Sequence, residues 1–258
     1  MSQAGAIHSV LLTGATGSIG SALANAYAAP GMTLFLQGRK VDQLDALAEQ
    51  CRLLGAVVKV AGFDLREREE LTNWLNSICG ETVPDLVIVN AGINIHGGPN
   101  NSGENWNEIE VLLEVNIRAS LATVNGVLPL MRQRGCGQIA LISSLAAYHG
   151  LPMTPSYCAS KAALKAYGEG LRSWLAGEGV KVNVVMPGYV ESAMCRDMPG
   201  PKPFLWGPDK AAQTIKRGLE RNQARISFPF PLNLGTWFLA VLPAGISQRM
   251  LRVLGYAA

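Results

Sequence analysis

The sequence predicts an α/β fold with a doubly wound parallel sheet, arranged as three layers (α/β/α) in a single domain over residues 1–258. Short apolar runs alternate six times with segments of helical spacing, and a glycine-rich turn follows the first run. The sequence contains no internal repeat and no stretch long enough to link two domains. This alternation requires right-handed crossovers, which place helices on both faces of the sheet.

The predicted strands are rich in leucine and β-branched residues, as strands buried on both faces must be. They cover residues 8–13, 32–37, 56–62, 85–90, 137–143 and 180–187. Apolar residues at helical spacing predict helices over residues 18–28, 41–54, 67–78, 104–132, 155–176 and 208–221. From Arg225 onward a short strand closed by prolines and two apolar helical pieces break this rhythm.

The composition is typical of a globular protein, with 48% hydrophobic and 16% charged residues. A net charge of +3 without a basic run argues against a nucleic-acid partner. No Cys/His cluster has zinc-ligand spacing, so no metal site is expected. The five scattered cysteines indicate free thiols in a reducing compartment, which predicts a cytoplasmic protein.

Neither end of the chain predicts a membrane-spanning segment. The N-terminal residues lack a cationic region before the first apolar run, which leads into a glycine turn and is interpreted as a strand. Residues 232–243 form the most apolar stretch near the C-terminus, but a spanning helix needs about 20 residues.

The stretch TGATGSIG, residues 13–20, lies between the first predicted strand and the first predicted helix. Glycines at this point permit a tight turn and the close approach of a pyrophosphate, whose charge then meets free N–H groups at the helix N-terminus. An ordinary strand-to-helix turn is the alternative. The alternating context favours dinucleotide binding, as in a Rossmann fold.

The stretch YCASK places a phenol, Tyr157, four residues before an ammonium, Lys161, so both lie on one helix face. An ammonium at about 5 Å, with an effective dielectric of about 20, stabilises a phenolate by roughly 3 kcal/mol, or about two pKa units. We therefore expect Lys161 to lower the pKa of Tyr157, and Tyr157 to act as general acid/base. An isolated Tyr and Lys on an exposed helix are the alternative.

Two further polar residues belong to the same pattern. Ser144 follows the fifth predicted strand, at the carboxyl edge where parallel sheets bind ligands, and its hydroxyl can donate to a substrate carbonyl oxygen. Asn116 lies inside a predicted helix between apolar neighbours. Taken singly, Ser144 could end a strand and Asn116 could be a satisfied core amide.

Together these motifs resemble the classical short-chain dehydrogenase/reductase family over about residues 7–228. One departure is that this branch favours glycine at the position of Ser18, whereas Gly17 gives a spacing similar to the extended, nucleotide-sugar branch. The chain length and active-site spacing favour the classical branch. The matching motifs, in chain order, are the glycine turn, Asp64, NAG at 90–92, Asn116, Ser144, Tyr157, Lys161 and PGYVES from Pro187.

The resemblance implies an oxidoreductase that transfers a hydride between a nicotinamide cofactor and a carbonyl or alcohol substrate, with catalytic residues Asn116, Ser144, Tyr157 and Lys161. It also implies that Lys161 holds the nicotinamide ribose, that Asn116 helps hold a proton-relaying water, and that the protein is a homodimer or homotetramer. The expected cofactor-binding residues are Gly14, Thr16, Gly17, Ser18, Ile19, Gly20, Arg39, Asp64, Leu65, Asn90, Ala91, Gly92, Tyr157, Lys161, Pro187, Gly188, Val190 and Ser192.

The end of the second predicted strand reads LQGRK and indicates the cofactor type. NAD enzymes place a carboxylate here for the ribose 2′-hydroxyl, whereas a 2′-phosphate is bound by arginine. Gly38 occupies the acidic position and Arg39 follows it. NADP(H) is therefore expected in preference to NAD(H), and carbonyl reduction is the expected direction. The alternative is that Arg39 and Lys40 only solvate a loop.

The loop at residues 193–207 is rich in proline and glycine around apolar side chains, and in the resembled family it covers the substrate. An apolar lining predicts a hydrophobic ketone or aldehyde rather than a sugar phosphate. His149 could contact substrate, although a lone histidine is more often structural. The residues expected to face the pocket are Met153, Tyr189, Met194, Met198, Phe204, Leu205 and Trp206.

Residues 229–258 form an apolar extension for which three interpretations compete: a lid on the protomer, a subunit interface, or an interfacial membrane anchor. A protein cover is favoured over peripheral membrane contact. Two short helices with only Arg249 and Arg252 as cations make a weak anchor.

Two other functions compete with the enzyme. A non-catalytic NADP-binding sensor or scaffold would not need the whole set of Asn116, Ser144, Tyr157 and Lys161. An extended-type sugar-nucleotide epimerase rests on the Gly17 spacing alone, and the chain after the sixth predicted strand leaves little room for its substrate domain.

Overall fold

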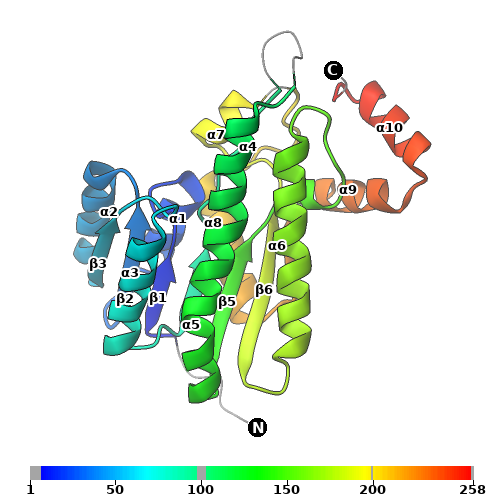
Figure 1. Ribbon diagram of the computed structural model, residues 1–258. Helices are drawn as coiled ribbons and strands as arrows, with labels where there is room; N and C mark the ends of the chain where they lie inside the picture. The colour runs from blue at the N-terminus through cyan, green and yellow to red at the C-terminus, as the bar shows by residue number, and fades with distance from the viewer. Residues whose placement is uncertain (1–6, 98–102, 199, 257–258) are drawn as a thin grey trace.

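The computed structural model describes residues 7–97, 103–198 and 200–256. Its centre is a seven-stranded sheet in the order β3-β2-β1-β4-β5-β6-β7, and every neighbouring pair is parallel (Figure 1). The chain winds outward from β1 to one edge and then from β4 to the other, so the winding direction reverses between β1 and β4. The strands are β1 Ser9–Leu12, β2 Thr33–Gly38, β3 Val57–Gly62, β4 Leu86–Val89, β5 Gly137–Ile142, β6 Val180–Pro187 and β7 Arg225–Phe228.

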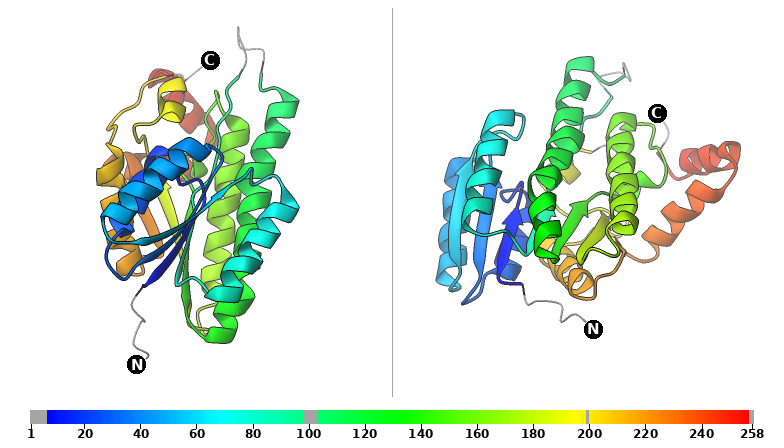
Figure 2. Two further views of the ribbon diagram at one scale, coloured as in Figure 1. Left: turned by 90° about the vertical axis from the view of Figure 1, so that its left-hand side faces the viewer. Right: turned by 60° about the horizontal axis from the view of Figure 1, so that its bottom comes forward.

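Helices cover both faces of the sheet, which confirms the predicted three-layer arrangement (Figure 2). One layer holds α1 Ser18–Tyr27, α2 Val41–Leu53 and α8 Pro208–Glu220, and the other holds α3 Arg68–Glu81, α5 Ser120–Arg134 and α6 Pro155–Trp174. Shorter elements are α4 Trp106–Leu113, η2 Glu114–Ala119, η3 Leu145–Ala147, α7 Ala193–Asp197, α9 Leu232–Val241 and α10 Ala244–Val253.

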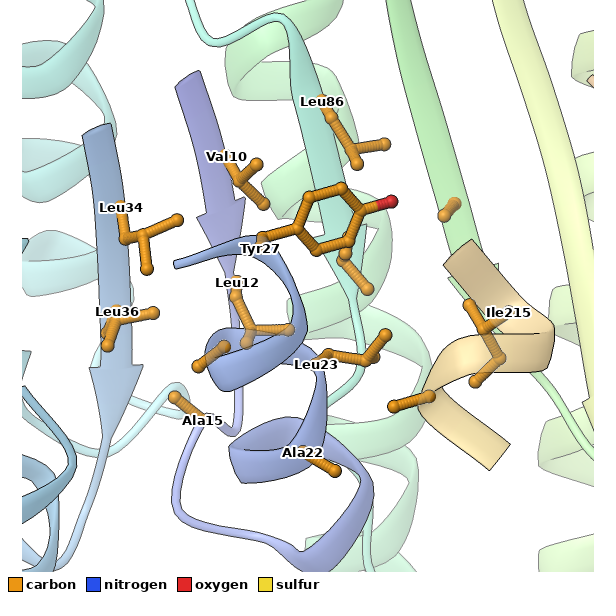
Figure 3. Packing of buried hydrophobic residues seen from close by; sticks show 14 of the residues in the cluster. Val10, Leu12, Ala15, Ala22, Leu23, Tyr27, Leu34, Leu36, Leu86 and Ile215 are labelled. Carbon is orange, nitrogen blue, oxygen red and sulfur yellow. The ribbon is translucent and has the colours of Figure 1, made fainter. Parts of the chain in front are cut away.

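The period of two along each strand divides the core between the two layers. In β1, Val10 and Leu12 pack toward α1, whereas Leu11 packs with the cluster on the opposite face. Figure 3 shows Val10 and Leu12 on the same side as Leu23 and Tyr27 of α1. The inner strands are buried on both faces, so their residues must be apolar or hydrogen-bonded, which explains their continuous apolar runs. The edge strand β3 is mostly exposed.

The predicted single α-helix over residues 104–132 is instead interrupted by a π-helical segment. The α4 helix ends at Leu113, η2 covers Glu114–Ala119, and α5 begins at Ser120. The whole segment is long and apolar enough to cross a membrane by composition, but half of its most apolar window is buried in the fold, as is typical of a core helix. The π-helical segment contains the fully buried Asn116.

Helices α9 and α10 extend away from the sheet beyond α6 (Figures 1 and 2). The Asn233 side-chain amide ties the start of α9 to β7 by donating to the Ser227 carbonyl at 3.1 Å. Trp237 and Phe238 remain 44% and 48% exposed. The described chain therefore leaves part of this extension uncovered, and its interpretation as a lid, a subunit interface or a membrane contact stays a prediction.

Candidate active site

A cavity of ≈ 820 Å³ lies at the carboxyl ends of the strands, where the winding direction reverses. Almost all of the predicted site residues line it, although they come from every part of the chain between Gly14 and Ser192. They are Gly14, Thr16, Gly17, Ser18, Ile19, Gly20, Arg39, Asp64, Leu65, Asn90, Ala91, Gly92, Ser144, Tyr157, Lys161, Pro187, Gly188, Val190 and Ser192. Asn116 is the exception, and it lies behind the cavity wall.

The fold constrains the three glycines of the turn after β1 to different degrees. Gly14 has a positive φ of 63°, and an added Cβ would lie 2.7 Å from the Ala91 Cα. An added Cβ on Gly20 would lie 2.3 Å from the Gly14 carbonyl oxygen. Gly17 has ordinary backbone angles, and its nearest neighbour would be 3.4 Å away. The fold itself therefore requires Gly14 and Gly20, but it does not require Gly17.

The space over Gly17 fits a bound pyrophosphate. Gly17 is the N-cap of α1 and provides no side-chain cap, so the first N–H groups of the helix are not satisfied by a cap. Ser18 and Ile19 line the cavity at the same point. Unsatisfied N–H groups and the positive end of a helix dipole are the features that bind phosphate.

We expect Gly20→Ala to lower the free energy of unfolding by about 2 kcal/mol or more, because the methyl group would overlap backbone. The matched variant Gly17→Ala should change the free energy of unfolding by less than about 1 kcal/mol. Urea denaturation of both variants tests this difference, and equal destabilisation of the two would contradict it.

The end of β4 is tied to the glycine turn by its own polar groups. The Asn90 side-chain amide donates to the carbonyls of Thr13 and Gly14 at 3.1 and 3.0 Å. The Thr13 hydroxyl accepts from the backbone N–H groups of Asn90 and Ala91. Asn90 therefore positions the turn, in addition to lining the cavity.

Gln37 is a site residue that sequence reasoning missed. Its amide oxygen accepts from the Gly14 N–H at 3.1 Å, and its amide nitrogen donates to the Phe63 carbonyl at 2.7 Å. Gln37 is 1% exposed and lines the cavity at the end of β2. The available signal was a polar amide inside an otherwise apolar strand, which predicts a structural hydrogen-bonding role.

Two cations, Arg39 and Lys40, line the cavity at the end of β2. The Arg39 guanidinium is 57% exposed and lies 3.7 Å from the Asp64 carboxylate. That carboxylate is held mainly by Arg66, whose hydrogen bonds keep the pKa of Asp64 below its ordinary value. An added Cβ on Gly38 would lie 3.0 Å from the Thr16 methyl group, so a carboxylate side chain there would crowd Thr16.

Tyr157 and Lys161 lie on one face of α6, as predicted, and both line the cavity. The Lys161 ammonium lies 5.7 Å from the centre of the Tyr157 ring and donates to the Ile142 carbonyl at 3.0 Å. The Ser143 hydroxyl donates to the Lys161 carbonyl at 2.7 Å and fixes the helix against the end of β5. The hydroxyl of Ser144 lies beside the Tyr157 phenol.

Burial controls the titration of this pair. It lowers the pKa of Lys161 from 10.5 to about 8 and raises the pKa of Tyr157 to about 12, although the hydrogen bond with Ser144 acts in the opposite direction on Tyr157. The expectation that Lys161 lowers the pKa of Tyr157 is therefore wrong for the chain by itself. Loss of hydration sets the direction of both pKa shifts.

Because its folded-state pKa is depressed, Lys161 destabilises the fold below about pH 8, and this effect disappears as pH rises through 10.5. The difference between the folded and the ordinary pKa of Lys161 corresponds to a destabilisation of about 3 kcal/mol. Replacing Lys161 removes this destabilisation but also removes the hydrogen bond to the Ile142 carbonyl, which contributes about 1 kcal/mol. We expect Lys161→Met to stabilise the protein by about 2 kcal/mol at neutral pH and by much less at high pH.

Denaturation of wild type and Lys161→Met across this pH range measures the effect. Lys165→Met is the control, because the Lys165 ammonium is paired with Glu169 one turn along the same helix. The control should not stabilise the protein. A Lys161→Met variant that is less stable than wild type at neutral pH would contradict the account.

Asn116 joins the loop after β4 to α6. Its amide oxygen accepts from the Ile93 N–H at 2.8 Å, and its nitrogen donates to the Ile93 carbonyl at 2.9 Å and to the Ser160 hydroxyl at 3.0 Å. An added Cβ on Gly92 would lie 3.0 Å from the Lys161 ammonium and 3.3 Å from the Asn116 oxygen. Asn116 thus supports the wall beside Lys161, and its part in a water relay stays a prediction.

Beyond Tyr157 the cavity is lined by the predicted residues Tyr189, Met194, Met198 and Phe204, and by His149. Trp206 does not line it, because its ring stacks on Phe228 at 5.1 Å and is covered by the Lys210 ammonium at 4.1 Å. Leu205 and Met153 are also outside the lining among the described residues. The far wall comes from the C-terminal extension, through Leu232, Gly235, Thr236, Phe238, Leu239, Met250, Leu251, Leu254 and Tyr256.

Comparison with known proteins identifies relatives over most of the chain. A family model described as short chain dehydrogenase matches residues 8–201. An uncharacterized oxidoreductase of Myxococcus xanthus (strain DK1622) is 34% identical over 235 residues, which cover 90% of this chain and 92% of the relative. The ketoacyl reductase HetN of Nostoc sp. (strain PCC 7120) is 30% identical over 224 residues, covering 84% of this chain and 77% of the relative.

Solved structures agree with this assignment. A short-chain dehydrogenase from Sphingobium yanoikuyae in complex with NADPH superposes with a TM-score of 0.81 at 25% identity, covering 97% of both chains. That coverage includes most of the C-terminal extension, which lies beyond the residues matched by the family model.

Proposed function

Because the chain belongs to the short-chain dehydrogenase family, we propose that it is an NADP-dependent reductase of hydrophobic ketones or aldehydes, with Tyr157 as the general acid. The observation that carries this proposal is the shared cavity. It joins a phosphate-binding helix terminus, two cations at the end of β2, and the Tyr157–Lys161 pair. Each feature alone has an ordinary structural explanation, but their convergence on one cavity fits cofactor-dependent carbonyl chemistry.

NADPH, when bound, supplies a hydride to the substrate carbonyl carbon. The N–H groups at the start of α1 would hold the pyrophosphate, and Lys161 would hold the nicotinamide ribose. Asp64 and Leu65 line the same end of the cavity as Arg39. Asn90 and Gln37 keep the glycine turn in place for this contact.

The proton needed for reduction comes from Tyr157. A pKa of about 12 keeps the phenol protonated at neutral pH, so it is ready to donate to the developing alkoxide. The Ser144 hydroxyl, beside the phenol, donates a second hydrogen bond to the same oxygen. Loss of the proton leaves a phenolate that the Lys161 ammonium stabilises, and solvent restores the proton, by the predicted relay through Lys161 and a water near Asn116.

Tyr157→Phe should lower kcat by about 1000-fold or more, because it removes the proton donor while keeping the ring. The Kd for NADPH, measured by fluorescence titration, should change by less than about threefold, since the pyrophosphate and phosphate contacts lie elsewhere. Turnover at the wild-type rate would exclude Tyr157 as the acid. A wild-type protein that binds NADPH but reduces none of a broad carbonyl panel would support the sensor alternative.

The preference for NADP(H) is supported by three neighbouring residues. Gly38 offers no carboxylate to a ribose 2′-hydroxyl, and Arg39 and Lys40 present cations to a 2′-phosphate at the cavity edge. The similar Sphingobium yanoikuyae enzyme was solved with NADPH. An NADPH-rich cytoplasm would drive the reaction toward reduction.

Arg39→Asp should weaken NADPH binding by about 30-fold or more, since it replaces a phosphate-pairing cation with a carboxylate. NADH binding should weaken much less or improve. Arg68→Asp is the charge-matched control, because Arg68 is exposed and does not line the cavity. Isothermal titration with both cofactors distinguishes these outcomes, and a wild-type protein that prefers NADH would overturn the assignment.

The assembly proposed with this function is a homodimer or homotetramer in the cytoplasm. Free thiols on all five cysteines are compatible with a reducing compartment. The exposed apolar side chains of α9 and α10 favour a further protein contact, because such surfaces rarely stay in water.

A further inference from the structure

The lining of the cavity differs in charge on the two sides of Tyr157. Its charged lining residues, Arg39, Lys40, Asp64 and Lys161, all lie at the cofactor end or at the junction. From Pro187 to Tyr256 the described lining residues include no Asp, Glu, Lys or Arg. No cation among the described residues lines the substrate end, and the nearby Lys202 ammonium is bonded to the Met198 carbonyl at 2.8 Å. Burying a carboxylate or phosphate there without a lining cation would be unfavourable.

Two apolar segments from different parts of the chain form this uncharged end. Phe204 and Met198 belong to the loop after β6, while Phe238, Leu251 and Leu254 belong to the C-terminal extension. Phe238 and Leu254 are 48% and 54% exposed, so this end of the cavity opens to solvent. A long substituent on a ketone could extend from Tyr157 along these side chains without meeting a closed wall.

Tyr256 joins the two segments. Its hydroxyl donates to the Pro201 carbonyl at 3.1 Å and accepts from the Tyr189 hydroxyl at 3.2 Å. Its backbone N–H donates to the Leu251 carbonyl at 2.9 Å. The Tyr256 side chain therefore connects the end of α10 to the loop after β6, through Pro201 and Tyr189.

We propose that α9 and α10 form one wall of a channel for an uncharged ketone with a long apolar substituent, and that the Tyr256 hydroxyl holds this wall in place. The inference rests on the proposed reductase function and specifies its substrate class. Phe238 is a substrate-contacting residue in this account, and Tyr256 is a positioning residue.

A homologous series of methyl ketones from about four to about twelve carbons tests whether α9 and α10 line a channel for long apolar substituents. For wild type, kcat/KM should rise about fourfold for each added methylene that becomes buried, since this is the transfer free energy of one methylene. Phe238→Ala should lower kcat/KM for the longest ketones by about tenfold or more and should affect the shortest ketone far less.

Trp237→Ala is the matched control for this test. Trp237 is an equally exposed aromatic residue on the same helix, but it does not line the cavity. Its removal should leave the dependence on chain length unchanged. Equal effects of Phe238→Ala and Trp237→Ala, or a wild-type kcat/KM that does not rise with chain length, would overturn the proposal.

The role of Tyr256 is tested with Tyr256→Phe, which keeps the ring and removes both hydroxyl contacts. KM for long ketones should rise severalfold while kcat changes little, because the reacting groups at Tyr157 are untouched. A KM equal to that of wild type across the series would exclude the positioning role.

These outcomes separate the inference from the proposed function. Reduction of short ketones with NADPH, without a preference for long ones, would contradict the channel and leave the reductase intact. Failure of wild type to reduce any ketone, despite tight NADPH binding, would contradict the reductase and therefore also the channel that rests on it.

Discussion

The candidate site is arranged around one unfavourable placement, the burial of the Lys161 ammonium at the junction between the two ends of the cavity. Lys161 is 4% exposed, and within the described part of the chain its ammonium donates only to the Ile142 carbonyl. The surrounding fold holds it there through the Ser143 hydroxyl on its backbone and through Gly92, which leaves no room for a side chain. The buried charge lowers the stability of the fold, as is common at functional sites.

That charge also divides the cavity into two chemical environments. On one side lie Arg39, Lys40 and the open N-terminus of α1, which suit a phosphate-bearing cofactor. On the other side lie uncharged residues from the loop after β6 and the C-terminal helices, which suit an apolar substrate. Tyr157 lines the cavity between these two ends, so under the proposed function it and the bound cofactor would both reach the same carbonyl group.

Much of this arrangement could be predicted from the sequence, because it depends on local patterns. The apolar runs predicted the strands, and the period of two along β1 determines which residues face each layer. The spacing between Tyr157 and Lys161 placed both on one helix face, and the polar residues that follow the strands meet at one edge because parallel strands end together.

The features that escaped prediction depend on surroundings that no local pattern contains. The pKa of Tyr157 depends on its burial, which reversed the shift expected from its neighbouring cation. The π-helical segment contains Asn116, whose hydrogen bonds go to Ile93 and Ser160, residues distant in the chain. Trp206 faces Phe228 rather than the cavity, and the wall formed by α9 and α10 depends on how the extension docks.

The most direct test of this account is the titration of the Lys161 ammonium itself in the cofactor-free protein. Nuclear magnetic resonance of protein labelled with ¹³C-lysine gives the pKa of each lysine from its ε-carbon shift, and Lys161→Met assigns the signal. The account predicts a midpoint for Lys161 near pH 8, well below the ordinary lysine value. A midpoint above about pH 10 would show that the ammonium is not desolvated, and would contradict the central claim.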